Sequence, residues 1–359
     1  MEILLGITAA DWIQLLKENQ FSINRRSWSK AIFLTLKSLY NSKEKKKEKK
    51  LFKDEIENVT IDQSPLFIIG HWRSGTTLLH NYMTVDKQFA YPNLFEVYNP
   101  HTFLHLEPII APKLEKADSR KRPMDNVAVS YKSPGEDEFA LNILSLKSPL
   151  LSWCFPRREG YYDRYLTFRD VYDEEKKEWQ DAFRLFLKKL TLFYKKQIIL
   201  KSPTHTCRIK MILEMFPDAK FIHIYRNPYN VFRSNQKLYD TVIQKMHVQS
   251  TNGYDPSESI LKRYKLMYDQ YFQEKELLQR NQLIELAFED FEKEPLEKIK
   301  QIYEQFDLGD FELCEKDMKS YHEKLSGYKK NKYEPIPDSL KDKIVAQWGK
   351  SFREWGYKT

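Results

Sequence analysis

A short apolar segment near residue 65 runs directly into a loop that contains two glycines. Residues 65–69 are a proline followed by leucine, phenylalanine and two isoleucines, and Gly70 and Gly75 come next, five residues apart. Only 10 of the 359 residues are glycine, well below the usual share of about 7%, so we expect each glycine where backbone geometry requires it. A helical pattern follows over residues 76–83. The segment therefore predicts a buried strand, a tight loop and a helix.

Three further apolar runs have the length and composition of buried strands. They cover residues 197–200, 220–225 and 283–288, and helical patterns occupy residues 209–216 and 260–280 between them. Strands that alternate with helices indicate βαβ units. The sequence therefore predicts an α/β fold of three layers, in which a central and mainly parallel sheet is flanked by helices.

The N-terminal part of the chain has a different pattern. Residues 8–40 carry two apolar stripes at helical spacing and predict two amphipathic helices. Residues 43–50 contain six lysines and two glutamates, and they supply half of the net charge of +8. We interpret this run as a solvated loop or helix end, and contact with a membrane or another anionic surface is the alternative. We predict an N-terminal helical extension with a lysine-rich linker over residues 1–53 and a main domain over residues 54–359.

Composition limits the class of protein and its surroundings. Hydrophobic residues make up 41% of the chain, but no apolar run approaches the roughly 20 residues that span a bilayer. The first residues lack the basic leader of a secretory signal, and three widely spaced cysteines suggest a reducing compartment. We predict a cytoplasmic protein, with peripheral membrane contact through residues 8–53 as an open alternative. Outside the lysine run the chain is only mildly basic, so no nucleic-acid partner is expected, and the oligomeric state stays open.

The loop after the first strand has the spacing of a phosphate-binding loop with one changed position. Its pattern is G-x-x-x-x-G-x-[ST], and Thr76 replaces the lysine that contacts the β- and γ-phosphates in such loops. A positive charge stands inside the loop instead, at Arg73. Backbone N–H groups and the helix N-terminus would hold a phosphate here. The pattern favours a donor with one 5′-phosphate over a nucleoside triphosphate, and a turn without a ligand is the alternative.

A second basic site follows the predicted strand at residues 220–225. Arg226 ends that strand, and Ser234 lies eight residues later, about two helical turns away. Because the ends of parallel strands meet along one edge of an open sheet, Arg226 and Ser234 are expected to bind a second phosphate. The alternative is a surface arginine in a turn.

These two segments together resemble the PAPS-dependent sulfotransferases, and most closely the bacterial-type branch that is similar to the tyrosylprotein and carbohydrate sulfotransferases. The resemblance extends over about residues 65–335, and it includes the sequences Leu-Lys-Ser-Pro at 200–203 and Phe-Glu-Asp-Phe at 288–291. It implies a P-loop-like fold, 3′-phosphoadenylyl sulfate (PAPS) as the co-substrate and no metal for transfer. It also implies that a set of residues from three segments contacts the nucleotide: Arg73, Ser74, Gly75, Thr76, Thr77, Arg226, Ser234, Tyr328, Lys329 and Lys330.

The resemblance also suggests which residues take part in catalysis. Arg73 would hold the leaving phosphate, and Lys201 resembles the family lysine that reaches the bridging oxygen. Glu96 stands where related enzymes carry a catalytic glutamate, and its apolar neighbours would raise its pKa, which suits a general base. His205 is the rival base, because cytosolic sulfotransferases use a histidine near this place, although the corresponding position here is Pro203.

Two histidines and an acidic cluster have less specific interpretations. His101 and His105 have the spacing of metal ligands on a helix, but no third ligand is evident and no metal site is predicted. Either histidine could line an acceptor pocket or cap a helix, and His101 also stays open as a base. The acidic residues 136–138 are interpreted as capping the N-terminus of a helix, with acceptor binding or orientation of a catalytic base as the alternative.

The leading hypothesis is therefore a sulfotransferase that acts on a hydroxyl of a glycan, a lipid or a small molecule. A degenerate P-loop kinase or nucleotide-binding protein is the first alternative, and Thr76 argues against it. A basic protein that binds membranes or nucleic acid through the lysine run is the second. The sequence does not separate the classes of acceptor.

Overall fold

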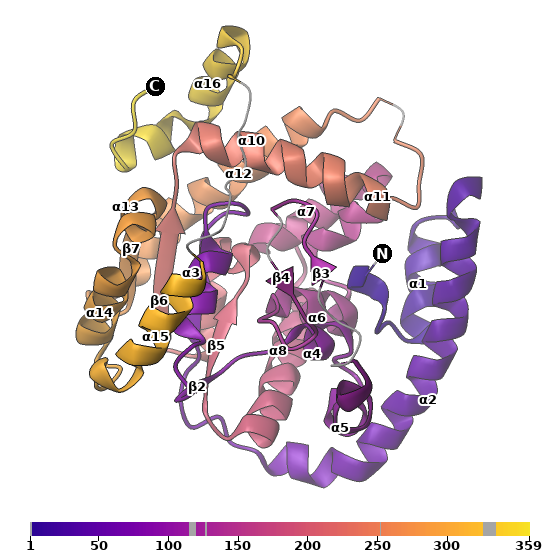
Figure 1. The fold of residues 1–359 in the computed structure, drawn as a ribbon. Coiled ribbons are helices and arrows are strands. Elements are labelled where there is room, and N and C mark those ends of the chain that lie inside the picture. The colour runs from indigo at the N-terminus through magenta and orange to yellow at the C-terminus, as the bar shows by residue number, and fades with distance from the viewer. Residues whose placement is uncertain (1, 115–119, 126–127, 252, 326–334) are drawn as a thin grey trace. The chain divides into compact units, whose positions relative to one another are not determined.

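The computed structural model describes residues 2–114, 120–125, 128–251, 253–325 and 335–359 (Figure 1). The chain divides into two compact units, each assembled from three stretches of sequence. The first unit comprises Met1–Asp62, Tyr91–Lys195 and Tyr239–Tyr254, and the second comprises Gln63–Ala90, Lys196–Leu238 and Asp255–Thr359. These units are not continuous in sequence, so they do not correspond to the two predicted domains. The predicted boundary between residues 53 and 54 stays a prediction.

The second unit contains a five-stranded sheet in the order β2-β5-β1-β6-β7. All neighbouring strands are parallel, so the polar residues that follow the strands meet along one edge. The strands are β1 (Leu66–Ile69), β2 (Phe89–Ala90), β5 (Gln197–Lys201), β6 (Lys220–Tyr225) and β7 (Leu283–Ala287). The predicted α/β class with a central parallel sheet is confirmed, and the predicted strands agree with the observed ones to within a residue or so.

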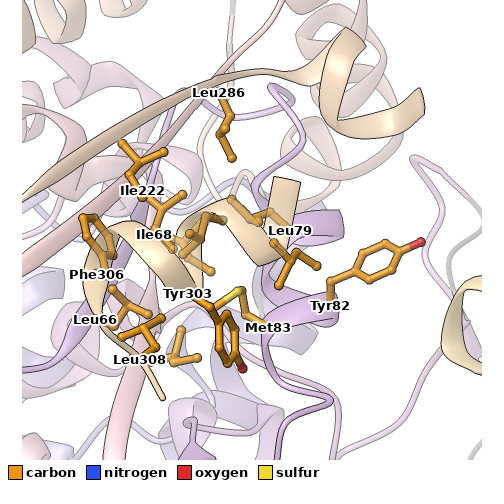
Figure 2. Close-up of a cluster of buried hydrophobic side chains, with 14 of the residues drawn as sticks. Leu66, Ile68, Leu79, Tyr82, Met83, Ile222, Leu286, Tyr303, Phe306 and Leu308 are labelled. Carbon is orange, nitrogen blue, oxygen red and sulfur yellow. The ribbon is translucent and has the colours of Figure 1, made fainter. Parts of the chain in front are cut away.

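Helices cover both faces of this sheet. On one face, alternate residues of the strands, including Leu66, Ile68 and Ile222, form a buried cluster with Leu79 of α3 and Phe306 of α14 (Figure 2). On the other face, aromatic rings of α12 pack against β6. The helices of this unit are α3 (Thr76–Met83), α9 (Ile209–Met215), α10 (Pro228–Leu238), α12 (Pro256–Glu274), α13 (Phe288–Lys293), α14 (Pro295–Phe306), α15 (Glu312–Lys324) and α16 (Asp338–Glu354). The observed helix α12 ends at Glu274, whereas the predicted helix over residues 260–280 extended further.

The first unit is mainly helical, with one short antiparallel pair of strands, β3 (Arg120–Lys121) and β4 (Ala128–Val129). Its helices are α1 (Ala9–Glu18), α2 (Trp28–Asn58), α4 (Leu94–Tyr98), α5 (Phe103–Leu114), α6 (Asp137–Ser145), α7 (Glu159–Thr167), α8 (Asp173–Tyr194) and α11 (Gln244–Met246). Residues 136–138 stand at the start of α6, as interpreted from the sequence. Within the described ranges, no helix has both the length and the apolar character needed to cross a bilayer.

The lysine run differs from the interpretation as a solvated loop or helix end. Residues 43–50 lie inside α2, a continuous helix of 31 residues. The reason is the spacing of the two glutamates: Glu44 and Glu48 are four residues apart on one side of the helix, and both are buried. The His105 ring lies between them, with Nε2 2.9 Å from Glu44 Oε2 and Nδ1 3.2 Å from Glu48 Oε2. Buried partners therefore hold the run in helical form.

Candidate active site

The loop between β1 and α3 has the backbone conformation that its glycines suggested. Gly70 has φ +142° and Gly75 has φ +110°, and Arg73 between them also has a positive φ, of +73°. Gly75 is the N-cap residue of α3. The N–H of Gly70 donates a hydrogen bond of 2.8 Å to the Thr206 hydroxyl, which ties the start of the loop to the segment after β5. The loop is thus fixed at both ends by the fold itself.

Several hydrogen-bond donors of this loop have no acceptor among the residues that the structure describes. The Ser74 hydroxyl is fully buried and has no hydrogen-bond partner among the described residues. The backbone N–H groups of Gly75 and Thr76, at the N-terminus of α3, likewise donate to no acceptor in the described part of the chain. Buried donors without acceptors are rare in folded proteins. Together with the partial positive charge of the helix N-terminus, they fit an anionic group such as a phosphate.

Residues of the two basic motifs, more than 150 positions apart, meet beside the loop. The Nε of Arg73 donates a hydrogen bond of 2.9 Å to the Ser234 hydroxyl. The Nη1 of Arg226 donates one of 3.4 Å to the Arg73 carbonyl oxygen. The Arg226 guanidinium also lies 4.2 Å from the centre of the Phe288 ring. The end of β6, the start of α10 and the phosphate-type loop therefore form one cluster of two arginines and a hydroxyl.

Lys201 and His205 come from the segment that begins at the end of β5. Lys201 is the last residue of that strand, pairs in register with Ile68 of β1 and is buried. Burial, and next the positive charge of Lys201, hold the pKa of His80 in α3 well below its usual range. His205 is also fully buried, and its ring lies edge-on to Phe67 at 5.5 Å. Lys201 thus brings a charge to the strand end, whereas the His205 ring packs against Phe67 of β1.

Glu96 belongs to the first unit, where it forms a capping box at the start of α4. Its Oε2 accepts a hydrogen bond of 2.6 Å from the Asn93 N–H, and the Glu96 N–H donates one of 3.0 Å to Asn93 Oδ1. The Tyr194 hydroxyl donates to Glu96 Oε1 at 2.8 Å. Burial, and next the negative charge of Glu107, raise the pKa of Glu96 well above its usual range. The direction of this shift agrees with the raised pKa that the apolar neighbours of Glu96 suggested.

His101 and His105 contact the N-terminal helices of the first unit. His105 is held by the two buried glutamates of α2, and His101 Nε2 lies 4.0 Å from Asp11 Oδ2 of α1. Across the described residues there is no group of three or more histidine, cysteine or carboxylate side chains arranged to hold a metal ion. Tyr328, Lys329 and Lys330 lie outside the described residues.

Sequence reasoning missed the residues that support the second basic motif. Glu289 accepts hydrogen bonds from the Asn227 N–H at 3.1 Å and from the Tyr357 hydroxyl at 2.6 Å. It thereby connects the end of β6 to the C-terminal residues. The sequence Phe-Glu-Asp-Phe at 288–291 marked this place without indicating a role. The partner Tyr357, almost 70 residues later, could not be recognised from local sequence.

Known proteins resemble this chain over most of its length. A model of the sulfotransferase family matches residues 65–312. The omega-hydroxy-beta-dihydromenaquinone-9 sulfotransferases of Mycobacterium tuberculosis and Mycobacterium bovis are each 33% identical over 353 residues, which covers 98% of this chain and 90% of theirs. The crystal structure of a sulfotransferase from Mycobacterium avium shares the fold, with a TM-score of 0.66, 17% identity and coverage of 97% of this chain and 96% of that one. A sulfotransferase structure from Mycobacterium tuberculosis gives a TM-score of 0.65 at 14% identity, covering 94% and 92%. The chain therefore belongs to the sulfotransferase family and is an enzyme that transfers a sulfuryl group.

Proposed function

We propose that this enzyme takes the sulfuryl group from PAPS and transfers it to a hydroxyl of a lipid acceptor. The observation that carries the donor assignment is the cluster of Arg73, Ser234 and Arg226 beside a loop with unused N–H and hydroxyl donors. A nucleotide with phosphates at both the 5′ and 3′ positions needs two anion sites close together. The bound donor supplies an activated sulfuryl group on its 5′-phosphate.

The first anion site is the loop itself. The N–H groups of Gly75 and Thr76 and the Ser74 hydroxyl are placed to hold the 5′-phosphate, and Arg73 adds a positive charge. Because these donors are fixed by the fold, they need little reorganisation as charge develops on the leaving phosphate. Thr76 in place of a lysine fits a donor without a γ-phosphate. The second anion site consists of Arg226 and Ser234, and the ring of Phe288 supports the Arg226 guanidinium.

Lys201 is proposed to stabilise the leaving group. Its ammonium group ends a strand next to β1 and is buried, so its charge acts through protein rather than through water. Electrostatic interactions are stronger in such surroundings. Its neighbour His80 has a pKa well below the usual range, so this ring is neutral at pH 7 and does not repel the lysine.

A lipid hydroxyl is the acceptor class that the comparisons favour among glycans, lipids and small molecules. The relatives that are 33% identical over 98% of this chain are named for a hydroxylated menaquinone, which is an isoprenoid quinone of the membrane. We therefore propose a hydroxylated isoprenoid lipid. A screen of glycan, phenol and isoprenoid alcohol acceptors with radiolabelled donor tests this choice, and selective labelling of a glycan or a phenol would contradict it.

The donor assignment predicts a strong preference for the 3′-phosphate. By isothermal titration calorimetry without Mg²⁺, adenosine 3′,5′-bisphosphate should bind about a hundredfold more tightly than ADP or ATP, because charge-assisted hydrogen bonds to the second phosphate add on the order of 3 kcal/mol. Arg226→Ala should remove most of this preference and leave ADP binding unchanged. Arg280→Ala, at an exposed position away from the cluster, is the matched control. Equal binding of ADP and the bisphosphate by the natural protein would contradict the assignment.

Glu96 is proposed as the general base, and the test uses its capping box. Glu96→Gln keeps a side chain that can cap α4, so the fold should persist while the proton acceptor is lost. Turnover should fall on the order of a hundredfold or more with unchanged binding of the bisphosphate. In the natural enzyme kcat should rise with pH through the raised pKa of Glu96, because only the ionised carboxylate accepts a proton.

The glutamine variant should lack this ascending limb of the pH profile. Glu107→Gln is the comparison variant: it should keep the ascending limb but move it to lower pH, because the negative charge of Glu107 helps to raise the pKa of Glu96. An unaltered turnover and pH profile in Glu96→Gln would move the base role to His205 or His101. The cytoplasmic location and the peripheral membrane contact through residues 8–53 stay predictions.

A further inference from the structure

The outward side of α2 carries an unusual concentration of exposed apolar side chains. Six large residues in the first half of the helix are each between 42% and 64% exposed. They are Trp28, Ile32, Phe33, Leu36, Leu39 and Tyr40. Single exposed apolar residues are normal on protein surfaces, but a contiguous group of large ones marks an interaction site. These six residues within 13 positions of one helix form such a group, which we call the apolar half of α2.

The second half of the same helix is basic on its outward side. All six lysines of residues 43–50 are exposed, whereas the two acidic residues in the run, Glu44 and Glu48, are buried. On the inner side both acids contact His105, and Lys189 Nζ lies 2.5 Å from Glu48 Oε1. The run therefore presents six positive charges outward and no negative one. Exposed acidic residues appear on this helix only from Asp54 onward.

The apolar and basic residues form one continuous stripe. Successive members are three or four positions apart, which places them on the same side of an α-helix. They are Trp28, Ile32, Leu36, Leu39, Lys43, Lys46 and Lys50. The stripe runs from residue 28 to residue 50 of this helix, which is about 33 Å at 1.5 Å per residue, so it is a long contact surface.

The helix is held in place from its inner side. Trp12 of α1 donates a hydrogen bond of 2.9 Å to the Thr35 hydroxyl. The Asn41 amide donates to the carbonyl oxygens of Leu5 and Ile7. With the buried Glu44, Glu48 and Lys189 contacts, these bonds fix the rotation of α2, so the stripe faces outward in the folded protein and does not form only on binding.

We propose that this outward stripe of α2 docks onto an anionic membrane surface. Apolar side chains on an interfacial helix enter the boundary between headgroups and acyl chains, and lysines contact the anionic headgroups. Charge complementarity favours this occupant over a second copy of the chain, because the same stripe on a partner would oppose lysines with further lysines and would offer no acidic residue from 28 to 50. The inference goes beyond the proposed transfer reaction, and it does not depend on the acceptor.

Vesicle binding by the full chain tests the proposal. We expect cosedimentation with vesicles of phosphatidylcholine and phosphatidylglycerol in equal parts, at least about tenfold stronger than with phosphatidylcholine alone, and weakening as salt increases. The triple variant K43E/K46E/K50E should bind the anionic vesicles on the order of a hundredfold more weakly, since each lysine near such a surface contributes about fivefold. The variant I32S/L36S/L39S should lose about tenfold or more, because its apolar side chains no longer enter the interface.

Matched controls separate this surface from charge and apolarity in general. K293E/K300E/K316E removes the same charge from exposed positions of the second unit, and L185S/L277S/L313S removes three exposed leucines elsewhere. Both should bind as the natural protein does. All variants should keep their melting temperature and their affinity for adenosine 3′,5′-bisphosphate, so failure of the donor assignment would appear in calorimetry and not in the vesicle assay.

Three outcomes would overturn the proposal. The first is a natural protein that stays in the supernatant with anionic vesicles. The second is undiminished binding by both α2 variants. The third is self-association of the natural protein in analytical ultracentrifugation that I32S/L36S/L39S abolishes without any change in vesicle binding. That result would assign the stripe to a second copy of the chain.

Discussion

Replacing Lys201 by alanine is expected to lower kcat by about a thousandfold and to leave the affinity for adenosine 3′,5′-bisphosphate nearly unchanged. The physical reason is that the lysine charge matters most when negative charge develops on the leaving phosphate, and a fixed charge in buried surroundings contributes on the order of 3–4 kcal/mol to such a transition state. In the ground state we expect the loop and the two arginines to hold the nucleotide without it. The measurement is single-turnover transfer from radiolabelled donor to an isoprenoid alcohol, with calorimetry for binding.

Two variants make this experiment specific. Lys196→Ala removes an exposed lysine just before the start of the same strand, β5. Lys196 donates a hydrogen bond of 2.6 Å to the Lys87 carbonyl oxygen. This variant should leave turnover unchanged. Lys201→Arg keeps the charge at an altered position and should recover part of the rate. A loss of binding equal to the loss of turnover in Lys201→Ala would contradict the role, because it would show that the lysine stabilises the ground state as much as the transition state.

The elements around the loop could be predicted from sequence because their signals are local. The apolar run that ends at Gly70, the helical pattern after Gly75 and the strand before Arg226 each lie within about ten residues. The rule that parallel strand ends meet at one edge then placed Arg226 near the loop. The observed hydrogen bond between Arg73 and Ser234 joins the two motifs as that topology allows, although this particular contact was not predicted.

The lysine run could not be interpreted correctly because its partners are distant in sequence. Glu44 and Glu48 are buried through His105, almost 60 positions away, and Glu48 also through Lys189, about 140 positions away. From sequence alone, eight charged residues in succession are typical of a solvated segment. The spacing of four between the two glutamates was the only local signal that they share one side of a helix, and six lysines around them obscured it.

Glu96 illustrates a partial success of a different kind. Its apolar neighbours predicted a raised pKa, and burial does raise it. The capping box was also readable, because Asn93 stands three residues before Glu96, yet the sequence gives no sign of the Tyr194 hydroxyl that donates to the carboxylate. A short helix with both carboxylate oxygens engaged keeps this side chain in one orientation, which a positioned proton acceptor also requires.

Gly70→Ala is expected to destabilise the protein by about 3 kcal/mol or more. Gly70 has φ +142°, where a side chain is strained, and a Cβ atom there would lie 2.3 Å from the Ile224 carbonyl oxygen. That oxygen belongs to the backbone of β6, which pairs with β1, so it cannot move aside as a flexible side chain would. The alanine must therefore displace one strand of the central sheet from its neighbour.

The measurement for this variant is the midpoint of urea unfolding, followed by tryptophan fluorescence. Gly160→Ala is the matched control, because Gly160 lies in α7 without a positive φ, and a Cβ atom there would meet nothing within 4 Å. That change should be neutral or slightly stabilising, since alanine favours helix over glycine by about 1 kcal/mol. Equal midpoints for the two variants would contradict the close approach of the loop to β6. A large loss in Gly70→Ala alone would mean that the glycine is required because the strand beside it leaves no room for a side chain, independently of any bound phosphate.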